Sequence, residues 1–183
     1  AAWRISEETF MRRTRSWLDN LKFRLSYGTL GNQYTSSLYP YMATIEPTTS
    51  IMPIGGSITS AMRQNSASNR YITWETIKMT NLGLDMGLFN NKLNMSFDYF
   101  IKDTDDILLR VELPGVLGVT EPYQNAGKVR NKGWELALSW KDKIGKNFTY
   151  GVDFNLSDVK NEVVSMGNTA DDFSGDQIRA VGY

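Results

Sequence analysis

The chain has 183 residues, with 20 Lys and Arg against 20 Asp and Glu, and it contains neither His nor Cys. The missing imidazole and thiol groups exclude Ser-His-Asp triads, cysteine nucleophiles and the usual zinc sites. A net charge of zero argues against a general nucleic-acid binder, which needs a basic surface to displace counterions.

The first segment predicts the end of a strand followed by a short helix. Residues 3–5 read as the tail of a strand. Ser6 then stands where an N-cap residue would, and the acidic Glu7 and Glu8 suit the first helical turn. The sequence has no charged segment followed by a short apolar region and no run of 18 apolar residues, so neither a signal peptide nor a spanning helix is expected.

Five later stretches alternate apolar and polar residues with period two, which is the pattern of a β-strand with two different faces. They are residues 21–27, 82–88, 93–99, 134–140 and 148–156. The apolar positions are mostly Leu, Met, Phe, Tyr and Trp, and the alternate positions are mostly small or hydrogen-bonding. A helix would spread these residues around its circumference, so the sequence predicts an all-β fold.

Short and long connections alternate along the chain. Asn90 and Asn91 predict a two-residue hairpin, because Asn tolerates a positive φ, and residues 141–147 with Gly145 predict a second short turn. Long irregular stretches cover residues 28–72 and 107–124, and a third begins near Met166. One end of the sheet is therefore predicted to be trimmed and the other to carry long loops.

Two architectures can accommodate such strands. A soluble β-sandwich, such as a carbohydrate-binding module, also alternates apolar and polar residues, but its buried face favours β-branched side chains. Here the only β-branched residue at the apolar positions is Val152. We therefore favour antiparallel up-and-down strands that form part of a large transmembrane β-barrel, with long extracellular loops and short periplasmic turns. The sandwich stays as the alternative.

The barrel interpretation assigns each strand residue to one of two faces. Trp140, beside a predicted turn, is expected at the membrane–water interface. The residues expected to face lipid are Leu21, Phe23, Leu25, Leu82, Leu84, Met86, Leu93, Met95, Phe97, Trp134, Leu136, Leu138, Trp140, Tyr150, Val152 and Phe154. The residues expected to face the lumen are Lys22, Arg24, Asp85, Asn94, Asp98, Glu135, Asp153 and Asn155.

Several short motifs follow one another along nearly the whole chain. They are Trp3-Arg4-Ile5-Ser6-Glu7-Glu8, Trp17-Leu18-Asp19-Asn20-Leu21-Lys22, Ser26-Tyr27-Gly28 with Gly31-Asn32, Trp74-Glu75-Thr76, Asn81-Leu82-Gly83-Leu84-Asp85, Phe89-Asn90-Asn91-Lys92-Leu93, Asp98-Tyr99 with Thr104 and Asp106, Asn125-Ala126-Gly127-Lys128-Val129-Arg130-Asn131-Lys132-Gly133-Trp134-Glu135, and Phe154-Asn155-Leu156 with Asn161 and Val163. In their order and spacing, these motifs resemble the C-terminal part of the barrel of SusC/RagA-type TonB-dependent outer-membrane transporters.

The resemblance implies an importer in the outer membrane of Gram-negative bacteria that takes up oligosaccharides or peptides. Its expected partners are outer-membrane lipid, a SusD-like surface lipoprotein and the TonB complex. It also implies that residues 1–183 are one partial barrel domain without the plug, the TonB box or the final strands, so that TonB would act through parts outside these residues. No enzymatic activity, catalytic residue, cofactor or metal is expected, and neither is a nucleic-acid partner.

Four tyrosines in the predicted loops are the candidate contacts with substrate or partner protein. Loops carry function disproportionately, and exposed rings there can stack on sugars or pack against a protein. The alternative is that each ring packs within its own loop. The four are Tyr34, Tyr39, Tyr41 and Tyr123.

Acidic residues elsewhere do not indicate catalysis. Asp98 and Glu135 are interpreted as polar groups of the lumen wall, because nothing indicates that they approach one substrate bond. The acidic run at residues 103–106 is interpreted as a solvated strand end, and the run at 171–176 lacks the spacing of a calcium loop. Replacement of Asp85 by Asn is expected to be tolerated, since any polar group suits a wet face.

Overall fold

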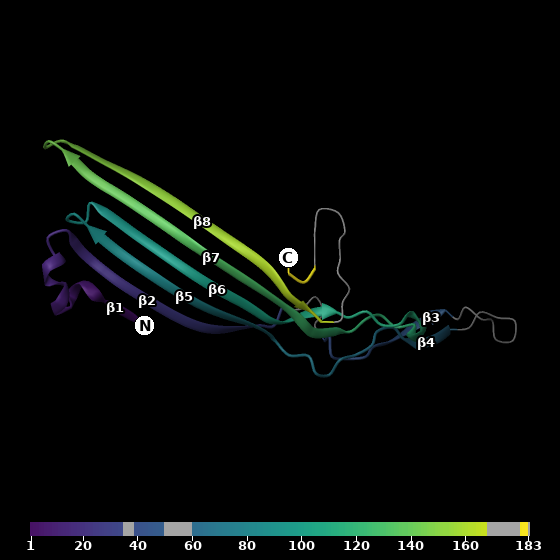
Figure 1. Ribbon diagram of the computed structural model, residues 1–183. Coiled ribbons are helices and arrows are strands. Elements are labelled where there is room, and N and C mark those ends of the chain that lie inside the picture. The colour runs from purple at the N-terminus through teal and green to yellow at the C-terminus, as the bar shows by residue number, and fades with distance from the viewer. Residues whose placement is uncertain (35–38, 50–59, 168–179, 183) are drawn as a thin grey trace. The chain divides into compact units, whose positions relative to one another are not determined.

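The computed structural model describes residues 1–34, 39–49, 60–167 and 180–182. It contains a six-stranded sheet in the order β1-β2-β5-β6-β7-β8 and a two-stranded sheet, β3-β4 (Figure 1). The large sheet follows chain order, with β3 and β4 falling within the connection between two neighbouring strands. The prediction of an all-β, up-and-down arrangement is therefore confirmed.

The strands are longer than the alternating stretches that predicted them, and each of the five stretches lies within one strand. The strands of the large sheet are β1 (Ala2–Arg4), β2 (Leu18–Asn32), β5 (Glu75–Leu88), β6 (Leu93–Arg110), β7 (Tyr123–Ile144) and β8 (Phe148–Met166). The small sheet consists of β3 (Ile45–Thr49) and β4 (Ser60–Gln64), which pair antiparallel.

The chain forms two compact units, and the long strands contribute to both. Unit 1 contains Ala1–Leu30, Ile77–Asp103 and Val129–Glu162. Unit 2 contains Gly31–Thr76, Thr104–Lys128 and Val163–Tyr183, and so includes the small sheet and the long connections.

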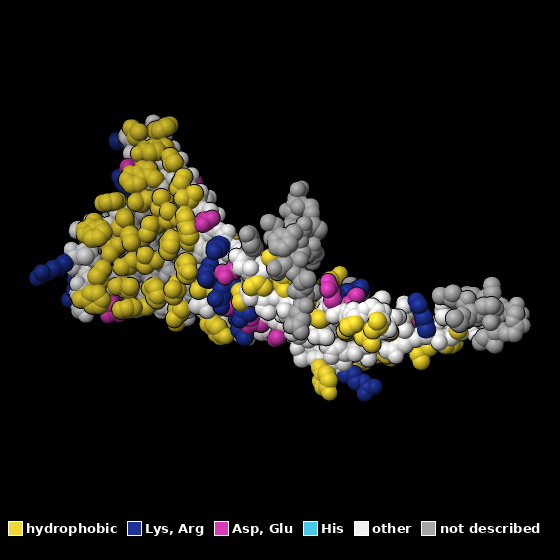
Figure 2. Space-filling model, turned by 45° about the vertical axis from the view of Figure 1, so that its right-hand side comes forward, with side chains coloured by type: hydrophobic (Ala, Val, Ile, Leu, Met, Phe, Trp, Pro, Cys, Tyr) yellow, Lys and Arg dark blue, Asp and Glu magenta, His cyan; other side chains and the backbone are white. Residues whose placement is uncertain are grey.

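The large sheet does not enclose a hydrophobic core. Among the described residues the buried hydrophobic side chains are Leu18, Val111 and Ala180. Figure 2 shows a continuous hydrophobic surface over unit 1, and exposed residues of its strands include Phe23, Leu25, Leu82, Phe97, Val152, Phe154 and Leu156. A β-sandwich would bury such a face against a second sheet. Since the other sheet in the described ranges has two short strands, the sandwich alternative is not favoured.

The N-terminal segment differs from its prediction in detail. The strand end is present as β1, where Trp3 lies opposite Phe23 of β2. Two short 3₁₀ helices follow, η1 (Ile5–Glu7) and η2 (Thr9–Thr14). The predicted N-cap is wrong, because Ser6 lies inside η1 and its buried hydroxyl has no hydrogen-bond partner among the described residues. The Trp3 indole instead ties the segment together by donating to Glu8 Oε1 at 2.9 Å.

The short turns are where the sequence placed them, but their lengths differ. The β5–β6 connection has four residues, 89–92, so the two-residue hairpin is wrong. Asn90 and Asn91 do have positive φ, and so does Phe89, whose φ of 56° carried no sequence signal. The β7–β8 turn is confined to residues 145–147 and begins with Gly145 at a φ of 67°.

The long connections hold more structure than predicted. The first contains β3 and β4, and the second contains a single 3₁₀ turn, η3 (Gly115–Leu117). Strand β8 ends at Met166, as expected, and the acidic run at 171–176 lies outside the described residues. None of the helices in the described ranges has the length and apolarity needed to cross a membrane.

Candidate functional site

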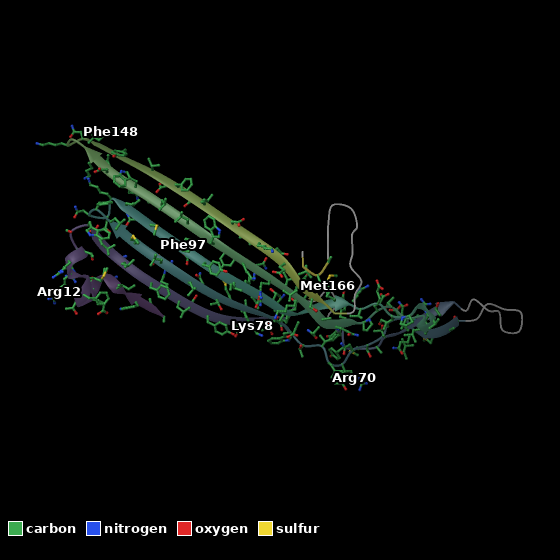
Figure 3. All side chains as sticks on the ribbon, viewed as in Figure 1. Arg12, Arg70, Lys78, Phe97, Phe148 and Met166 are labelled. Atoms are coloured by element: carbon green, nitrogen blue, oxygen red, sulfur yellow. The ribbon has the colours of Figure 1, made fainter. Side chains whose placement is uncertain are left out.

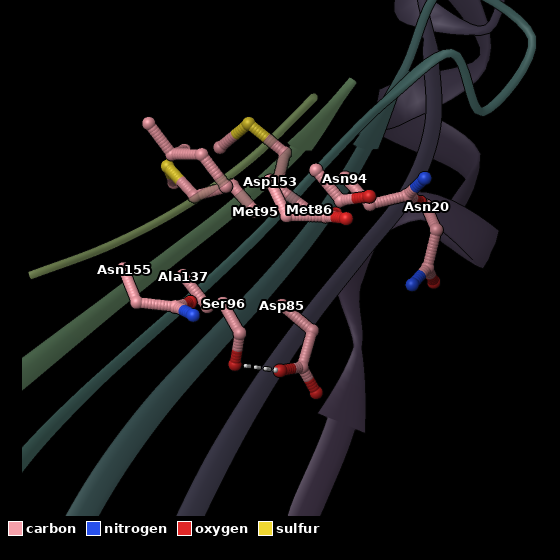
Figure 4. Close-up of a pocket in the computed structure, with 11 residues that line it drawn as sticks. Asn20, Asp85, Met86, Asn94, Met95, Ser96, Ala137, Asp153 and Asn155 are labelled. Atoms are coloured by element: carbon pink, nitrogen blue, oxygen red, sulfur yellow. Dashed lines mark hydrogen bonds between the residues drawn. The ribbon is translucent and has the colours of Figure 1, made fainter. Parts of the chain in front are cut away.

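A charged network gathers around Arg24 on one face of β2, β5 and β6. The Arg24 guanidinium donates to both carboxylate oxygens of Asp85, at 2.8 and 2.9 Å, and to Asp98 Oδ2 at 2.9 Å. The Ser96 hydroxyl donates to Asp85 Oδ1 at 3.0 Å (Figure 4). The three charged side chains are 21% to 33% exposed, so water screens this network only in part.

A glycine on the neighbouring strand makes room for this network. A Cβ atom built on Gly83 would lie 2.6 Å from Arg24 Cζ, with both terminal guanidinium nitrogens within 2.8 Å. The guanidinium therefore lies directly over the backbone of β5 on its way to Asp85. Glycine in the middle of a strand weakens it, and here the absence of a side chain serves a close approach.

Two grooves follow the same face, one from β2 to β8 and the other from β6 to β8. Figure 4 shows Asp85 and Ser96 directed toward each other in one of them, with Met86 and Met95 pointing away. This groove has a volume of about 410 Å³, and its polar lining includes Asn20, Asp85, Asn94, Ser96, Ser139, Asp153 and Asn155. The second has a volume of about 320 Å³, and its lining includes Asp98, Glu135, Asn155 and Ser157.

The eight residues expected to face the lumen thus share one polar face. Six of them line the two grooves. Arg24 joins this group through its ion pairs, and Lys22 lies close enough to Asp85 to act on it electrostatically. The arrangement provides hydrogen-bonding groups along an open wall, with no group of acidic side chains among the described residues that could hold a metal.

The alternate residues of the strands form an apolar and aromatic face. The rings of Phe97 and Trp134 stack with centroids 6.4 Å apart. Near the β7–β8 turn, Phe148 stacks on Tyr150 at 6.4 Å, and Trp140 Nε1 donates to the Tyr150 hydroxyl at 3.4 Å. Trp140 therefore joins an aromatic cluster at the end of the sheet that carries the short turns.

Ion pairs flank this apolar stretch at both ends. At the short-turn end of unit 1, Lys92 Nζ lies 2.7 Å from Asp142 Oδ1. At the other end of the stretch, Arg130 donates to both oxygens of Asp103, at 2.6 and 2.8 Å. In unit 2, a further pair on β6 and β7 joins Asp105 to Lys128 at 2.8 Å.

These pairs overturn the interpretation of residues 103–106 as a solvated strand end. Strand β6 continues through them to Arg110, and two of the three carboxylates in the run pair with cations on β7. Asp106 has a φ of 61°, and its backbone carbonyl accepts a hydrogen bond from Asn125 Nδ2 at 2.8 Å. The run thus holds two strands together.

The four candidate tyrosines have different surroundings. Tyr34 is 82% exposed, and the rings of Tyr39 and Tyr41 meet edge to face with centroids 6.3 Å apart. The placement of Tyr123 in a loop is wrong, because it is the first residue of β7. The Arg110 guanidinium lies over its ring, 5.1 Å from the centroid, so this tyrosine is occupied within the fold.

A cleft in unit 2 brings Tyr41 together with residues that the sequence did not single out as a site. It has a volume of about 320 Å³ and is lined by Asn32, Gln33, Pro40, Tyr41, Arg70, Ile72, Thr73, Trp74 and Leu108. They come from three separate parts of the chain. In the sequence, the one feature that could have indicated this cleft is the pair Arg70 and Trp74, which stands shortly before a strand. No spacing rule connects that pair to residues 32–41.

The amino-acid sequence matches a family model over most of its length. Residues 12–181 match the model described as "TonB dependent receptor-like, beta-barrel". The chain belongs to this family. The match agrees with the open sheet of two unlike faces and with the alternation of short and long connections.

Curated relatives carry the same family name. TonB-dependent receptor P3 of Formosa agariphila is 33% identical over 172 residues, which cover 94% of this chain and 17% of that protein. TonB-dependent receptor SusC of Bacteroides thetaiotaomicron is 30% identical, and the match covers 96% of this chain and 18% of that protein. The chain thus spans less than a fifth of the length of these relatives.

Solved structures support the same fold. The RagAB peptide importer in its "open-open" state aligns with the whole chain at a TM-score of 0.81 and 25% identity, covering 19% of that protein's chain. The RagAB peptide transporter aligns at a TM-score of 0.78 and 24% identity. The chain therefore has the fold of one section of a much larger β-barrel.

Proposed function

We propose that this chain forms part of the wall of an outer-membrane importer of nutrients. In this proposal the apolar face of the strands meets lipid and the polar face meets the water-filled lumen. Family membership supports the class of protein, and the two unlike faces of the sheet support the role of a wall.

The observation that carries the proposal is the height of the apolar face between its two charged ends. Asp103 of β6 lies 11 positions after Lys92, which immediately precedes this strand. At about 3.3 Å per residue and a tilt of about 40°, this separation gives a rise of about 28 Å. The apolar band of an outer-membrane barrel is about 25 Å tall. Every second residue between these two charges is apolar, namely Leu93, Met95, Phe97, Tyr99 and Ile101.

The polar face suits the lumen of a transporter. The Arg24 network joins three neighbouring strands on this face, and the grooves beside it offer hydroxyl, amide and carboxylate groups to water or passing cargo. Charged side chains would be expensive on a lipid face, whereas a wet lumen accommodates them. The proposed role is a passive wall, without chemistry on the cargo.

The proposed cargo is an oligosaccharide or a peptide, and the proposed partners act through the complete protein. The related proteins include SusC and the RagAB peptide importer. By analogy with them, we propose that a SusD-like surface lipoprotein caps the barrel. The TonB complex is proposed to energise import through parts of the protein beyond these residues.

Labelling of single cysteines tests the proposed faces. The chain has no native Cys, so four consecutive positions of β8 can be compared in the full-length protein in lipid nanodiscs, with any other cysteines removed. A membrane-impermeant maleimide should label Asp153→Cys and Asn155→Cys, and it should spare Val152→Cys and Phe154→Cys. Equal labelling at all four positions, or the reverse pattern, would overturn the assignment.

Cargo uptake tests the transport function. In a host from which the gene has been deleted, the full-length protein should restore growth on an oligosaccharide or a peptide as sole carbon source. Growth on each of these carbon sources is compared with and without the gene. If growth is the same in both cases on all of them, although the protein is present in the outer membrane, the result argues against an importer.

A further inference from the structure

We propose that the cleft of unit 2 binds a sugar ring that carries an anionic group, a carboxylate or a sulfate. The inference rests on the proposed import function and narrows its cargo to acidic oligosaccharides. The cleft, which has a volume of about 320 Å³, is open enough for a saccharide unit at the low end of the usual size of ligand sites.

Two exposed aromatic rings border the cleft. Trp74 is 64% exposed and Tyr41 is 49% exposed, although each is large enough to be buried readily in a packed fold. The Trp74 ring lies against the backbone at Gly31, where an added Cβ would be 3.1 Å from Cε3. The indole is thus held at the surface with apolar area available, which suits stacking on the apolar face of a sugar ring.

The cleft also contains a cation that has no counter-charge among the described residues. Arg70 lies at the surface of unit 2 (Figure 3), and in the part of the chain that the structure describes it makes no hydrogen bond or ion pair. By contrast, Arg24 and Arg130 each bind carboxylates on neighbouring strands. The guanidinium of Arg70 therefore offers its planar set of donors to a ligand, and that geometry matches a carboxylate or sulfate.

Two residues outside the lining, Glu75 and Asn125, hold the walls of the cleft in place by hydrogen bonds to lining residues. Glu75 Oε2 accepts from Asn32 Nδ2 at 2.9 Å, and Glu75 Oε1 accepts from the Leu108 backbone N–H at 3.2 Å. Asn125 binds the backbone of Thr73 on both sides, accepting from its N–H at 2.9 Å and donating to its C=O at 2.8 Å. A frame fixed before binding lowers the entropic cost of association.

Combining these features favours an acidic sugar over an acidic peptide. A peptide carboxylate could pair with Arg70, but a peptide does not need two exposed rings beside the cation. A pyranose ring presents a flat apolar face and hydroxyl groups together, and the cleft pairs rings with the polar groups of Gln33 and Thr73. The peptide becomes an outcome of the test.

Binding to the full-length protein in nanodiscs tests the proposal by calorimetry. The probes are an oligogalacturonide, its neutral methyl ester, a sulfated oligosaccharide of similar length, and a Glu-rich peptide. Arg70→Gln should weaken binding of the preferred acidic saccharide about tenfold and change binding of the neutral ester less than about twofold. The galacturonide and sulfated probes distinguish the two anionic groups.

Ring variants test the stacking contribution. Trp74→Ala should weaken the acidic and neutral saccharides alike, and Trp74→Phe should retain most of the affinity because it keeps a ring. Tyr71→Ala is the matched control, since Tyr71 is 90% exposed, close in sequence and not part of the lining. Amounts of folded protein in the outer membrane show whether each variant assembles.

The outcomes separate this inference from the import function. If uptake depends on the protein but is unchanged by Arg70→Gln and Trp74→Ala, the proposed sugar site in the cleft is wrong and the proposed import function stands. If the protein binds the saccharide tightly but does not take it up, the proposed import function is wrong and the proposed binding site stands. Binding of the peptide alone, an equal effect of Arg70→Gln on charged and neutral saccharides, or binding of none of the probes would overturn the acidic-sugar site.

Discussion

Arg24 and Gly83 lie on neighbouring strands, and the guanidinium of Arg24 occupies the space that any side chain at position 83 would need. From there it reaches the carboxylates of Asp85 on β5 and Asp98 on β6. The network therefore depends on a residue that contributes no functional group. Four substitutions, three with a matched control and one within a double-mutant cycle, test this and other features of the fold.

Gly83→Ala should destabilise the full-length protein by about 1–3 kcal/mol, because the added methyl group forces Arg24 away from its carboxylates. Gly28→Ala on β2 is the control, since a Cβ there meets no atom within 4 Å. Denaturant unfolding in lipid bilayers measures both. Equal stability of the two variants would show that Arg24 reaches the carboxylates by another path.

Asp85→Asn should cost about 1–2 kcal/mol, because Arg24 loses a charged partner in a partly screened site. A double-mutant cycle with Arg24→Gln measures the interaction: the loss in the double variant should be smaller than the sum of the single losses. Additive losses would contradict an energetic coupling. This expectation replaces the one from sequence, which had Asp85→Asn tolerated.

Leu136→Arg should reduce assembly in the outer membrane, with a cost of about 2–4 kcal/mol near the middle of the bilayer. Its neighbour in the chain supplies the control, because Glu135 lines a groove on the polar face and Glu135→Gln should be tolerated. Heat-modifiable mobility of membrane fractions on gels reports the folded fraction. Similar folded fractions for the two variants would refute the assignment of faces.

Asn125→Ala should loosen the segment around Thr73, because it removes hydrogen bonds to both backbone groups of that residue. Hydrogen exchange of the Thr73 amide should become about tenfold faster, which corresponds to about 1.4 kcal/mol. Asn161→Ala, which removes a bond to the side chain of Asn131 in unit 1, should leave that amide unchanged. Unchanged exchange in both variants would mean that other contacts hold the segment.

The sequence predicted the strands wherever apolar and polar residues alternate, and it failed where charge replaces the apolar residue. Beyond Tyr99, β6 continues through Asp103 and Asp105, which interrupt the apolar pattern while cross-strand ion pairs hold the ladder together. The same effect hid the start of β7, and with it the position of Tyr123. Pairing between strands is a property of two segments, so a pattern within one segment does not reveal it.

Local reading of the chain also could not assemble the cleft. Asn32, Arg70 and Leu108 meet there only because three separate segments converge in unit 2. The faces of the strands were easier, since position parity alone groups Asp85 with Gly83 and separates both from Leu84. The parity of a position predicts on which face of the sheet its side chain lies, but not which side chain of a neighbouring strand it contacts. For this reason the Arg24 network became apparent only in the structure.

Because unit 1 has almost no buried side chains, it is a wall that is one β-sheet thick. In a protein with a packed interior, a substitution disturbs neighbours in every direction. Along β6, by contrast, odd and even positions lie on opposite faces of the sheet. A substitution at Met95 and one at Ser96 are therefore constrained by different surroundings. In the proposed orientation of the sheet, a library that randomises the even positions from 94 to 100, with Ser96 and Asp98 of the Arg24 network kept, would redesign the surface offered to cargo while leaving the lipid-facing side chains unchanged.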